Sequence, residues 1–143
     1  MSDKTLIDKL IEASRAGVRV DMIVRGICCL RGGVPGWTDN IHIISVVGRY
    51  LEHSRIYVFG EGVRQEIYLG SGDLLERNTR RRVEVFVQPQ SQEIRNKLLH
   101  IMDCVERDTE QSWIMQSDGS YRRVPQDGER MDSQMALFDY FAG

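Results

Sequence analysis

The amino-acid sequence predicts an α/β domain in which a mixed β-sheet is flanked by helices. Two observations support this fold class. First, a helical pattern over Thr5–Ala16 is followed, after Gly17, by the alternating apolar pattern of a strand over Val18–Val24. A helix that leads directly into a strand is the repeating unit of α/β proteins. Second, further strand-like runs are followed by a long helical pattern and by a short C-terminal helix. We expect the strand over Val18–Val24 to be central in the sheet.

Size and composition predict one soluble domain over residues 1–143. The net charge of −2 argues against a nucleic-acid partner, because polyanions select strongly basic surfaces. Any affinity for a polyanion must therefore come from local arginines. The three cysteines form no CxxC pair and indicate a reducing cytoplasm. No apolar run approaches the length of about 18 residues that a membrane span needs, and we expect no signal peptide.

Strands and turns alternate in the first half of the chain. The segment over residues 31–40 is dense in turn residues and predicts a loop. Two apolar runs follow, over Ile41–Val47 and Arg55–Phe59, and both predict strands. Gly60–Gly62 then predicts a turn, after which Gln65–Leu69 is a suitable hairpin partner for the preceding strand.

The second half begins with a helical turn over Leu74–Asn78 and a strand over Arg82–Val87, which Pro89 closes. Ser91 is suited to cap a helix that continues to about Arg107. The residues of its apolar face recur at helical spacing: Ile94, Leu98, Ile101, Met102 and Val105.

The last part of the chain predicts a small hairpin and a final helix. Trp113–Met115 and Tyr121–Val124 flank the turn sequence Ser-Asp-Gly-Ser, which favours a hairpin. A short helix begins near Asp132, and its apolar side chains should pack against the domain: Met131, Met135, Leu137, Phe138 and Phe141.

Arg25 is the first candidate for a functional side chain. It follows the predicted strand over Val18–Val24 and precedes Gly26. Ligands of open α/β sheets bind beyond the carboxyl ends of the strands, and a guanidinium offers a planar fork of donors for phosphate oxygens. The alternative is a surface arginine, or one paired with a nearby carboxylate.

His53 and Arg55 form the second candidate. They are two residues apart, so on an extended chain both side chains project to the same face. An imidazole beside a fixed cation is a workable phosphate site, because the histidine can attack or donate a proton while the arginine neutralises the phosphoryl oxygens. The alternative is a solvent-facing turn.

Weaker signals lie downstream. The small residues of Gly70–Gly72 would let a backbone approach an anion closely, with Ser71 as a phosphate-binding candidate, although most such triplets are plain turns. In the run Arg80–Arg82, strand alternation would place Arg80 and Arg82 on one face, by default a solvated edge. No Cys or His spacing predicts a metal site. Two histidines are expected to be structural: His42 and His100.

With these residues identified, the chain resembles the C-terminal catalytic domain of class 1 polyphosphate kinases. The match extends over nearly the whole chain in the same order. Its linked stretches are Ala13–Val18, Ile23–Leu30, the Gly-Val-Pro-Gly loop, Asp39–Arg55, Gly70–Val85, Asp118–Arg123 and Ser133–Tyr140. The fold that this resemblance implies is a phospholipase D-like domain, a superfamily in which two similar half-sites each supply a histidine.

The resemblance implies a reaction and a set of roles. The family reversibly transfers the γ-phosphate of ATP, with Mg²⁺, to inorganic polyphosphate through a phosphohistidine that belongs to the preceding domain. Arg25 and His53 match ATP-contacting positions of the family. Arg25 then resembles a phosphate clamp, and His53 resembles the second histidine of the paired site, a proton donor or stabiliser. Arg55 stands beside it as a further phosphate-binding residue, and no Mg²⁺ ligand is assigned in this chain.

The sequence also departs from the patterns that it resembles. A phospholipase D motif would have a lysine where Arg55 stands and a later acidic residue near Gly60. The family usually has serine and alanine before the aspartate at position 73, where this chain has Ser71 and Gly72. The match begins well inside the family's last domain, so we expect a domain truncated at its N-terminus, a natural or expressed fragment.

We therefore expect a half-site of a polyphosphate kinase that binds phosphate weakly by itself and catalyses nothing without the missing nucleophile. Its partners would be ATP or ADP, polyphosphate and the remaining domains of the enzyme, in a homo-oligomer located in the cytoplasm or peripherally on a membrane. Two alternatives stay open. One is a free-standing phospholipase D-type phosphodiesterase that pairs two half-sites across a dimer, and the other is a non-enzymatic polyphosphate-binding module.

Overall fold

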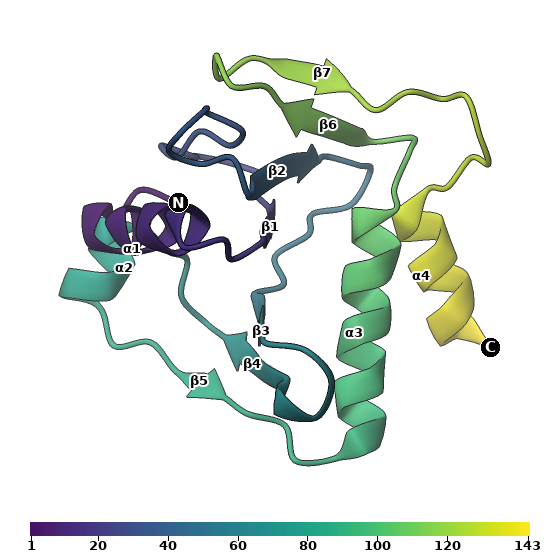
Figure 1. The fold of residues 1–143 in the computed structure, drawn as a ribbon. Helices are drawn as coiled ribbons and strands as arrows, with labels where there is room; N and C mark the ends of the chain where they lie inside the picture. The colour runs from purple at the N-terminus through teal and green to yellow at the C-terminus, as the bar shows by residue number, and fades with distance from the viewer.

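Two β-sheets, rather than one, organise the molecule (Figure 1). The computed structural model describes residues 1–143. The first sheet has four strands in the order β1-β2-β6-β7, and the second has three in the order β3-β4-β5. The mixed α/β class predicted from the sequence is confirmed, while the separation into two sheets was not foreseen.

The four-stranded sheet is the mixed one. Strand β1 (Val20–Ile23) runs parallel to β2 (Ile41–Val46), with Val20 opposite Ile41. Strand β6 (Ser112–Met115) is antiparallel to β2, and β7 (Tyr121–Arg123) is antiparallel to β6. The second strand and the late hairpin predicted from the sequence are therefore confirmed.

Strand β1 lies at the edge of this sheet, so the expectation of a central strand was wrong. It is also shorter than predicted, because the backbone N–H of Val18 donates to the carbonyl of Ala13 and closes helix α1 (Lys4–Arg15). Gly17 turns the chain between helix and strand with a φ of +86°, a conformation that glycine adopts without steric cost. The predicted helix over Thr5–Ala16 is confirmed with a shift of one residue.

The three-stranded sheet is antiparallel. Strands β3 (Ile56–Phe59) and β4 (Glu66–Gly70) form the predicted hairpin, joined through the 3₁₀ turn η1 (Gly62–Arg64). Strand β5 (Phe86–Val87) has only two residues and pairs with the end of β4. The longer strand predicted over Arg82–Val87 was therefore wrong.

Helix α2 (Glu76–Arg81) explains that difference. It begins later than the helical turn predicted from the sequence and continues through Arg81, so that Arg80 is helical and Arg82 follows the helix. The prediction that Arg80 and Arg82 share one face of a strand was therefore wrong. Beyond the helix, Glu84 accepts hydrogen bonds from Asn78 and Ser71 at 2.8 and 2.6 Å, and residues 82–85 form no strand.

The core lies between α1 and the four-stranded sheet. Its buried side chains come from both β-strands and loops: Met1, Leu30, Ile41, Ile43 and Met115. Apolar side chains of α1 pack against them, among them Ile7, Leu10 and Ile11. The amphipathic pattern that predicted α1 thus buries the face expected of it.

Helices α3 (Gln92–Glu106) and α4 (Ser133–Ala142) pack side by side (Figure 1). The rings of His100 and Tyr140 meet between them at a centroid distance of 4.2 Å. Docking of α4 is only partly as expected, since Phe138 and Phe141 remain 61% and 55% exposed. Ser91 occupies the N-cap position of α3 without a side-chain hydrogen bond. None of the helices is long and apolar enough to span a membrane.

Candidate functional site

Arg25 and His53 both follow the carboxyl end of a strand in the parallel pair β1-β2. Arg25 comes two residues after β1, and His53 lies in the segment that connects β2 to β3, and thus the first sheet to the second. Parallel strands present their carboxyl ends at one edge of a sheet, where ligands of α/β proteins bind. The Arg25 side chain is exposed and has no hydrogen-bond or salt-bridge partner.

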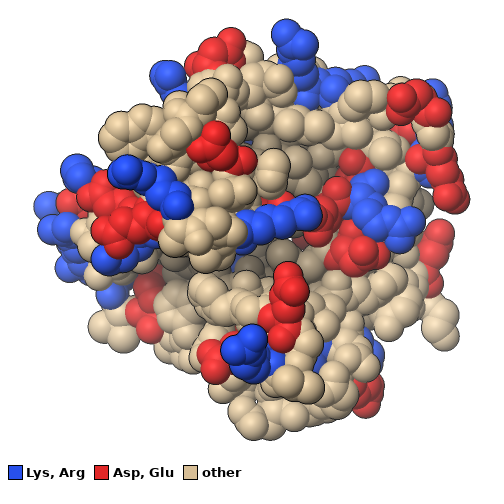
Figure 2. Space-filling view, in the orientation of Figure 1, with Lys and Arg blue, Asp and Glu red and all other residues tan.

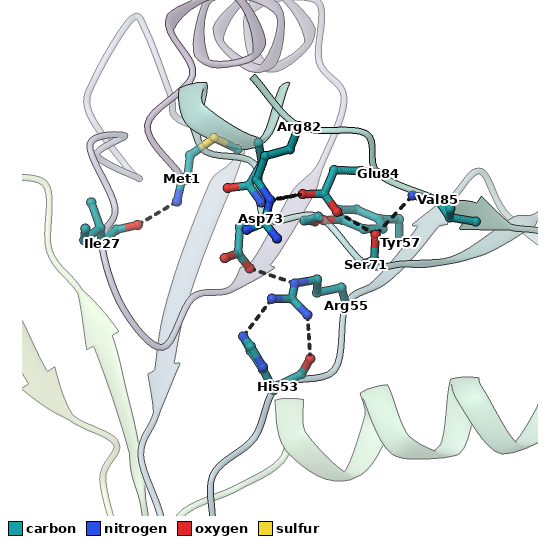
Figure 3. A network of polar contacts seen from close by, with 12 residues as sticks. Met1, Ile27, His53, Arg55, Tyr57, Ser71, Asp73, Arg82, Glu84 and Val85 are labelled. Carbon is teal, nitrogen blue, oxygen red and sulfur yellow. Dashed lines mark hydrogen bonds and ion pairs between the residues drawn. The ribbon is translucent and has the colours of Figure 1, made fainter. Parts of the chain in front are cut away.

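Arg55 is the centre of a polar network (Figure 3). Its Nη2 lies 2.7 Å from Nε2 of His53, and its Nη1 donates to the carbonyl of His53 at 3.3 Å. Its Nε donates to Oδ1 of Asp73 at 2.9 Å. Because a guanidinium can only donate, Nε2 of His53 is the acceptor, which corresponds to the neutral imidazole with its proton on Nδ1. The structure thus brings His53 and Arg55 together, as the sequence predicted.

The β3-β4 hairpin sets the distance between Arg55 and Asp73. Arg55 immediately precedes β3, and its carbonyl accepts a hydrogen bond from the N–H of Gly70 at the end of β4. The hydroxyl of Tyr57 donates to the carbonyl of Gly72 at 2.9 Å and fixes the peptide before Asp73. Arg55 is therefore fixed by backbone pairing, and the peptide before Asp73 is fixed by the side chain of Tyr57.

Asp73 is the site residue that sequence reasoning missed. A phospholipase D motif would have its acidic residue near Gly60, but there the backbone turns with a φ of +72°. The carboxylate comes instead from the end of the next strand. A signal was present, because the Gly-Ser-Gly-Asp sequence ends a predicted hairpin partner, but only the hairpin register shows that Asp73 faces Arg55.

Arg55 and Asp73 stabilise each other's charge. The hydrogen bond from the Arg55 guanidinium, opposed by partial desolvation and aided by the charge of Arg55, holds the pKa of Asp73 below its ordinary value. The side chains of Arg55 and Asp73 are 19% and 37% exposed. Asp73 therefore neutralises part of the charge of Arg55, and both Nη groups of the guanidinium are directed to His53.

The segment that follows Arg25 lies near the same polar network. The amino group of Met1 donates to the carbonyl of Ile27 at 2.6 Å, and its charge also contributes to the lowered pKa of Asp73 (Figure 3). No direct contact joins Arg25 to His53. The structure thus brings the two segments to one region, with the free guanidinium of Arg25 on one and the fixed guanidinium of Arg55 on the other.

Ser71 is engaged elsewhere. Its hydroxyl donates to the carboxylate of Glu84 at 2.6 Å and accepts from the N–H of Val85 at 3.0 Å. Its own backbone N–H donates to the carbonyl of Val85. The hydrogen bond from the Ser71 hydroxyl and one from Asn78 hold the pKa of Glu84 below its ordinary value. Phosphate binding by Ser71 stays a prediction, and it would require these donors to be released.

Acidic and basic side chains are interspersed over the visible face of the molecule (Figure 2). A hollow of about 740 Å³ lies against β1, β2 and α3, and neither Arg25 nor His53 lines it. His42 is exposed on β2, whereas His100 packs in the helix pair. No group of three or more Cys, His, Asp or Glu side chains could hold a metal ion.

Comparison with known proteins gives a consistent result. The family model described as polyphosphate kinase C-terminal domain 2 matches residues 1–134. A polyphosphate kinase of Synechocystis is 46% identical over 95% of this chain and 19% of its own length. One of Pseudomonas aeruginosa is 42% identical over 99% of this chain and 21% of its own length.

Among solved structures, the crystal structure of polyphosphate kinase from Porphyromonas gingivalis superposes with a TM-score of 0.93 and 33% identity. The match covers all of this chain and 22% of that one. The chain thus spans about a fifth of the length of the relatives that it matches.

Proposed function

The chain belongs to the polyphosphate kinase C-terminal domain 2 family, and from this premise we propose that its site binds the phosphates of ATP and polyphosphate. In the longer protein it would take part in reversible transfer of the ATP γ-phosphate to polyphosphate. The observation that carries the proposal is the Arg55 guanidinium, held by Asp73 at 2.9 Å and aimed at His53 at 2.7 Å. That is a preorganised cation beside an imidazole at the edge where two parallel strands end.

Phosphoryl transfer needs positioned positive charge more than covalent chemistry from the protein. Arg25 is free to form a bidentate, charge-assisted pair with phosphate oxygens. Arg55 supplies a second positive charge whose orientation is already fixed, so little reorganisation accompanies binding. Neutral His53 retains the N–H of Nδ1 as a donor to a phosphoryl oxygen, because its Nε2 accepts from Arg55.

The phosphorylated histidine is a separate group in this proposal. His53 acts as a hydrogen-bond donor that stabilises a phosphoryl oxygen, and the nucleophile comes from another domain of the full enzyme. Mg²⁺ would arrive with ATP, coordinated by the triphosphate, since the Asp73 carboxylate is already paired with Arg55. When bound, the ion neutralises charge that develops on the phosphoryl oxygens.

Binding to the 143-residue chain tests the proposal directly. We expect a polyphosphate titration at low salt to show weak binding, and Arg25→Ala and His53→Ala each to weaken it by about tenfold, the effect of losing one hydrogen bond to a charged group. The matched control is Arg107→Ala, whose exposed guanidinium pairs only with Asp103 on the same helix. Equal affinities of the wild type and both site variants would contradict the proposal.

Turnover tests the separate role of His53. In a complete polyphosphate kinase with this domain, His53→Ala should reduce polyphosphate synthesis by about 10²–10³-fold, the range for losing one hydrogen-bond donor to developing charge, while thermal unfolding stays unchanged. Unchanged kinetics would remove His53 from the mechanism.

The isolated chain should synthesise no polyphosphate, and synthesis by it would show that no second histidine is needed. Hydrolysis of a phosphodiester substrate by a dimer would instead favour the phospholipase D-type alternative.

A further inference from the structure

The segment that carries His53 is held by a side chain from the C-terminal helix. Oε1 of Gln134 accepts a hydrogen bond from the N–H of Tyr50 at 2.8 Å, and Nε2 of Gln134 donates to the carbonyl of Tyr50 at 2.8 Å. Nε2 also approaches Oε1 of Glu52 at 3.3 Å. The two residues are 84 positions apart in the sequence, and Gln134 is only 7% exposed.

The side-chain amide of Gln134 takes the hydrogen-bonding role of a neighbouring strand. Two hydrogen bonds to the N–H and carbonyl of one residue are what a neighbouring strand would supply in an antiparallel ladder. Between Gly48 and Ser54 the backbone forms no hydrogen bond with another part of the backbone. Gln134 therefore supplies the fixed partner of the segment that leads from β2 to His53.

The Gln134 amide is closely packed against Gly48. A Cβ added at Gly48 would lie 2.5 Å from Oε1 of Gln134, well inside van der Waals contact. The end of a glutamine side chain can usually move to relieve such a clash. Here both polar atoms are already bonded to Tyr50, so a shift would break the pairing. Gly48 is thus the position at which the segment can pass this close to the helix.

The helix end that carries Gln134 is itself fixed. Oδ1 of Asp132 caps the helix by accepting from the N–H groups of Gln134 and Met135 at 3.0 and 3.1 Å. The N–H of Ser133 donates to Oδ2 of the buried Asp108 at 2.7 Å. A rigid backbone therefore presents a rigid amide, which is how second-layer groups orient active-site residues.

We propose that Gln134 is a positioning residue, which sets the location of His53 by pairing with the backbone of Tyr50. The inference rests on the proposed function only in taking His53 as a site residue. It gives the C-terminal helix a role in the candidate site through Gln134. The exposed aromatic side chains of that helix do not account for this role.

The test uses Gln134→Met, which keeps the length of the side chain but cannot form either hydrogen bond, and Met135→Ala as a control on the same helix. Met135 is 46% exposed and makes no side-chain hydrogen bond. The chain has three histidines, so their imidazole signals can be followed separately by NMR. His100 stacks on Tyr140 of α4 and reports whether the helix stays docked, and His42 on β2 reports the sheet.

For Gln134→Met we expect the His53 signal to shift and broaden, with His42 and His100 unchanged, and polyphosphate affinity to fall by about three- to tenfold, as for the loss of one ordinary hydrogen bond. Met135→Ala should match the wild type in both measurements. Gly48→Ala attacks the same contact from the other side and should reproduce the His53 change, which covers the case that Gln134→Met fails to fold.

An unchanged His53 signal in both Gln134→Met and Gly48→Ala would overturn the inference. A His100 signal that changes together with His53 would also overturn it, because Gln134 would then act only by docking the helix. If His53→Ala binds polyphosphate as well as the wild type, the proposed function fails, and the His53 signal in Gln134→Met still decides the role of Gln134.

Discussion

At the scale of single residues, Arg55 decides what the site can do. A guanidinium free in solution would pair with any passing anion and would have no fixed orientation. Here Asp73 accepts from its Nε, which leaves the Nη groups directed to His53. The carboxylate therefore acts on the imidazole through the arginine, and Asp73 needs no contact with a ligand to influence binding.

Replacing Asp73 by asparagine tests this coupling. The side chain keeps its shape but loses its charge, so Arg55 should become less ordered. We expect the free energy of unfolding to fall by about 0.5–1 kcal/mol, as for a partly exposed ion pair. Urea unfolding measures this change. Asp103→Asn is the control, because its pair with Arg107 is exposed on both sides and should change stability less.

The same pair predicts a pH dependence. The pKa of Asp73 is lowered from 3.8 in the folded protein by its bond with Arg55, so the folded state favours the ionised carboxylate. The stabilisation is complete above pH 3.8 and disappears as the pH falls through the lowered pKa. Comparing urea unfolding of the wild type and Asp73→Asn, we expect a constant difference at pH 5 to 7 that shrinks below pH 4. A difference that persists at the lowest pH would contradict this origin.

At the scale of elements, the β3-β4 hairpin is the part that aligns Arg55 with Asp73. Its strands pair from Ile56 opposite Leu69 to Phe59 opposite Glu66, and the turn begins at Gly60. That glycine has a φ of +72°, and a Cβ there would lie 2.9 Å from the carbonyl oxygen of Arg64. The turn therefore requires glycine both for its conformation and for its space.

Gly60→Ala should destabilise the chain by about 1–2 kcal/mol, since the new methyl group meets backbone and the conformation is unfavourable for alanine. Gly128→Ala is the matched control, because no atom lies within 4 Å of its added Cβ. Thermal unfolding compares the two variants. Equal stability of both would mean that the turn relaxes without cost.

At the scale of the whole molecule, the site collects residues from segments far apart in the chain. Arg25 follows β1, His53 lies in the segment between β2 and β3, Asp73 follows β4, and Gln134 lies in the first turn of the last helix. The core between α1 and the first sheet holds β1 and β2, while the hairpin of the second sheet holds the ion pair. The site therefore depends on how the two sheets are joined, and the segment from Val47 to Arg55 makes that connection.

Much of this organisation could be predicted from short stretches of sequence. The helix over Lys4–Arg15, the hairpin β3-β4 and the helix after Asp132 follow from local periods, caps and turns. The closeness of His53 and Arg55 also follows from their spacing. Where the prediction failed, at β1 and at Arg80–Arg82, a local pattern suited a strand, but the hydrogen bond from Val18 to Ala13 and the continuation of α2 through Arg81 gave another conformation.

The fold class, most elements, the family resemblance and the candidate residues Arg25, His53 and Arg55 could thus be recognised before folding, because each rests on motifs of neighbouring residues. The folded structure was needed to show that β1 lies at an edge, that Asp73 holds Arg55 and that Gln134 holds the segment before His53. Those contacts depend on strand register and helix placement. A sequence period of two or 3.6 residues indicates which face of a strand or helix a side chain occupies. It does not indicate which distant group that side chain will contact.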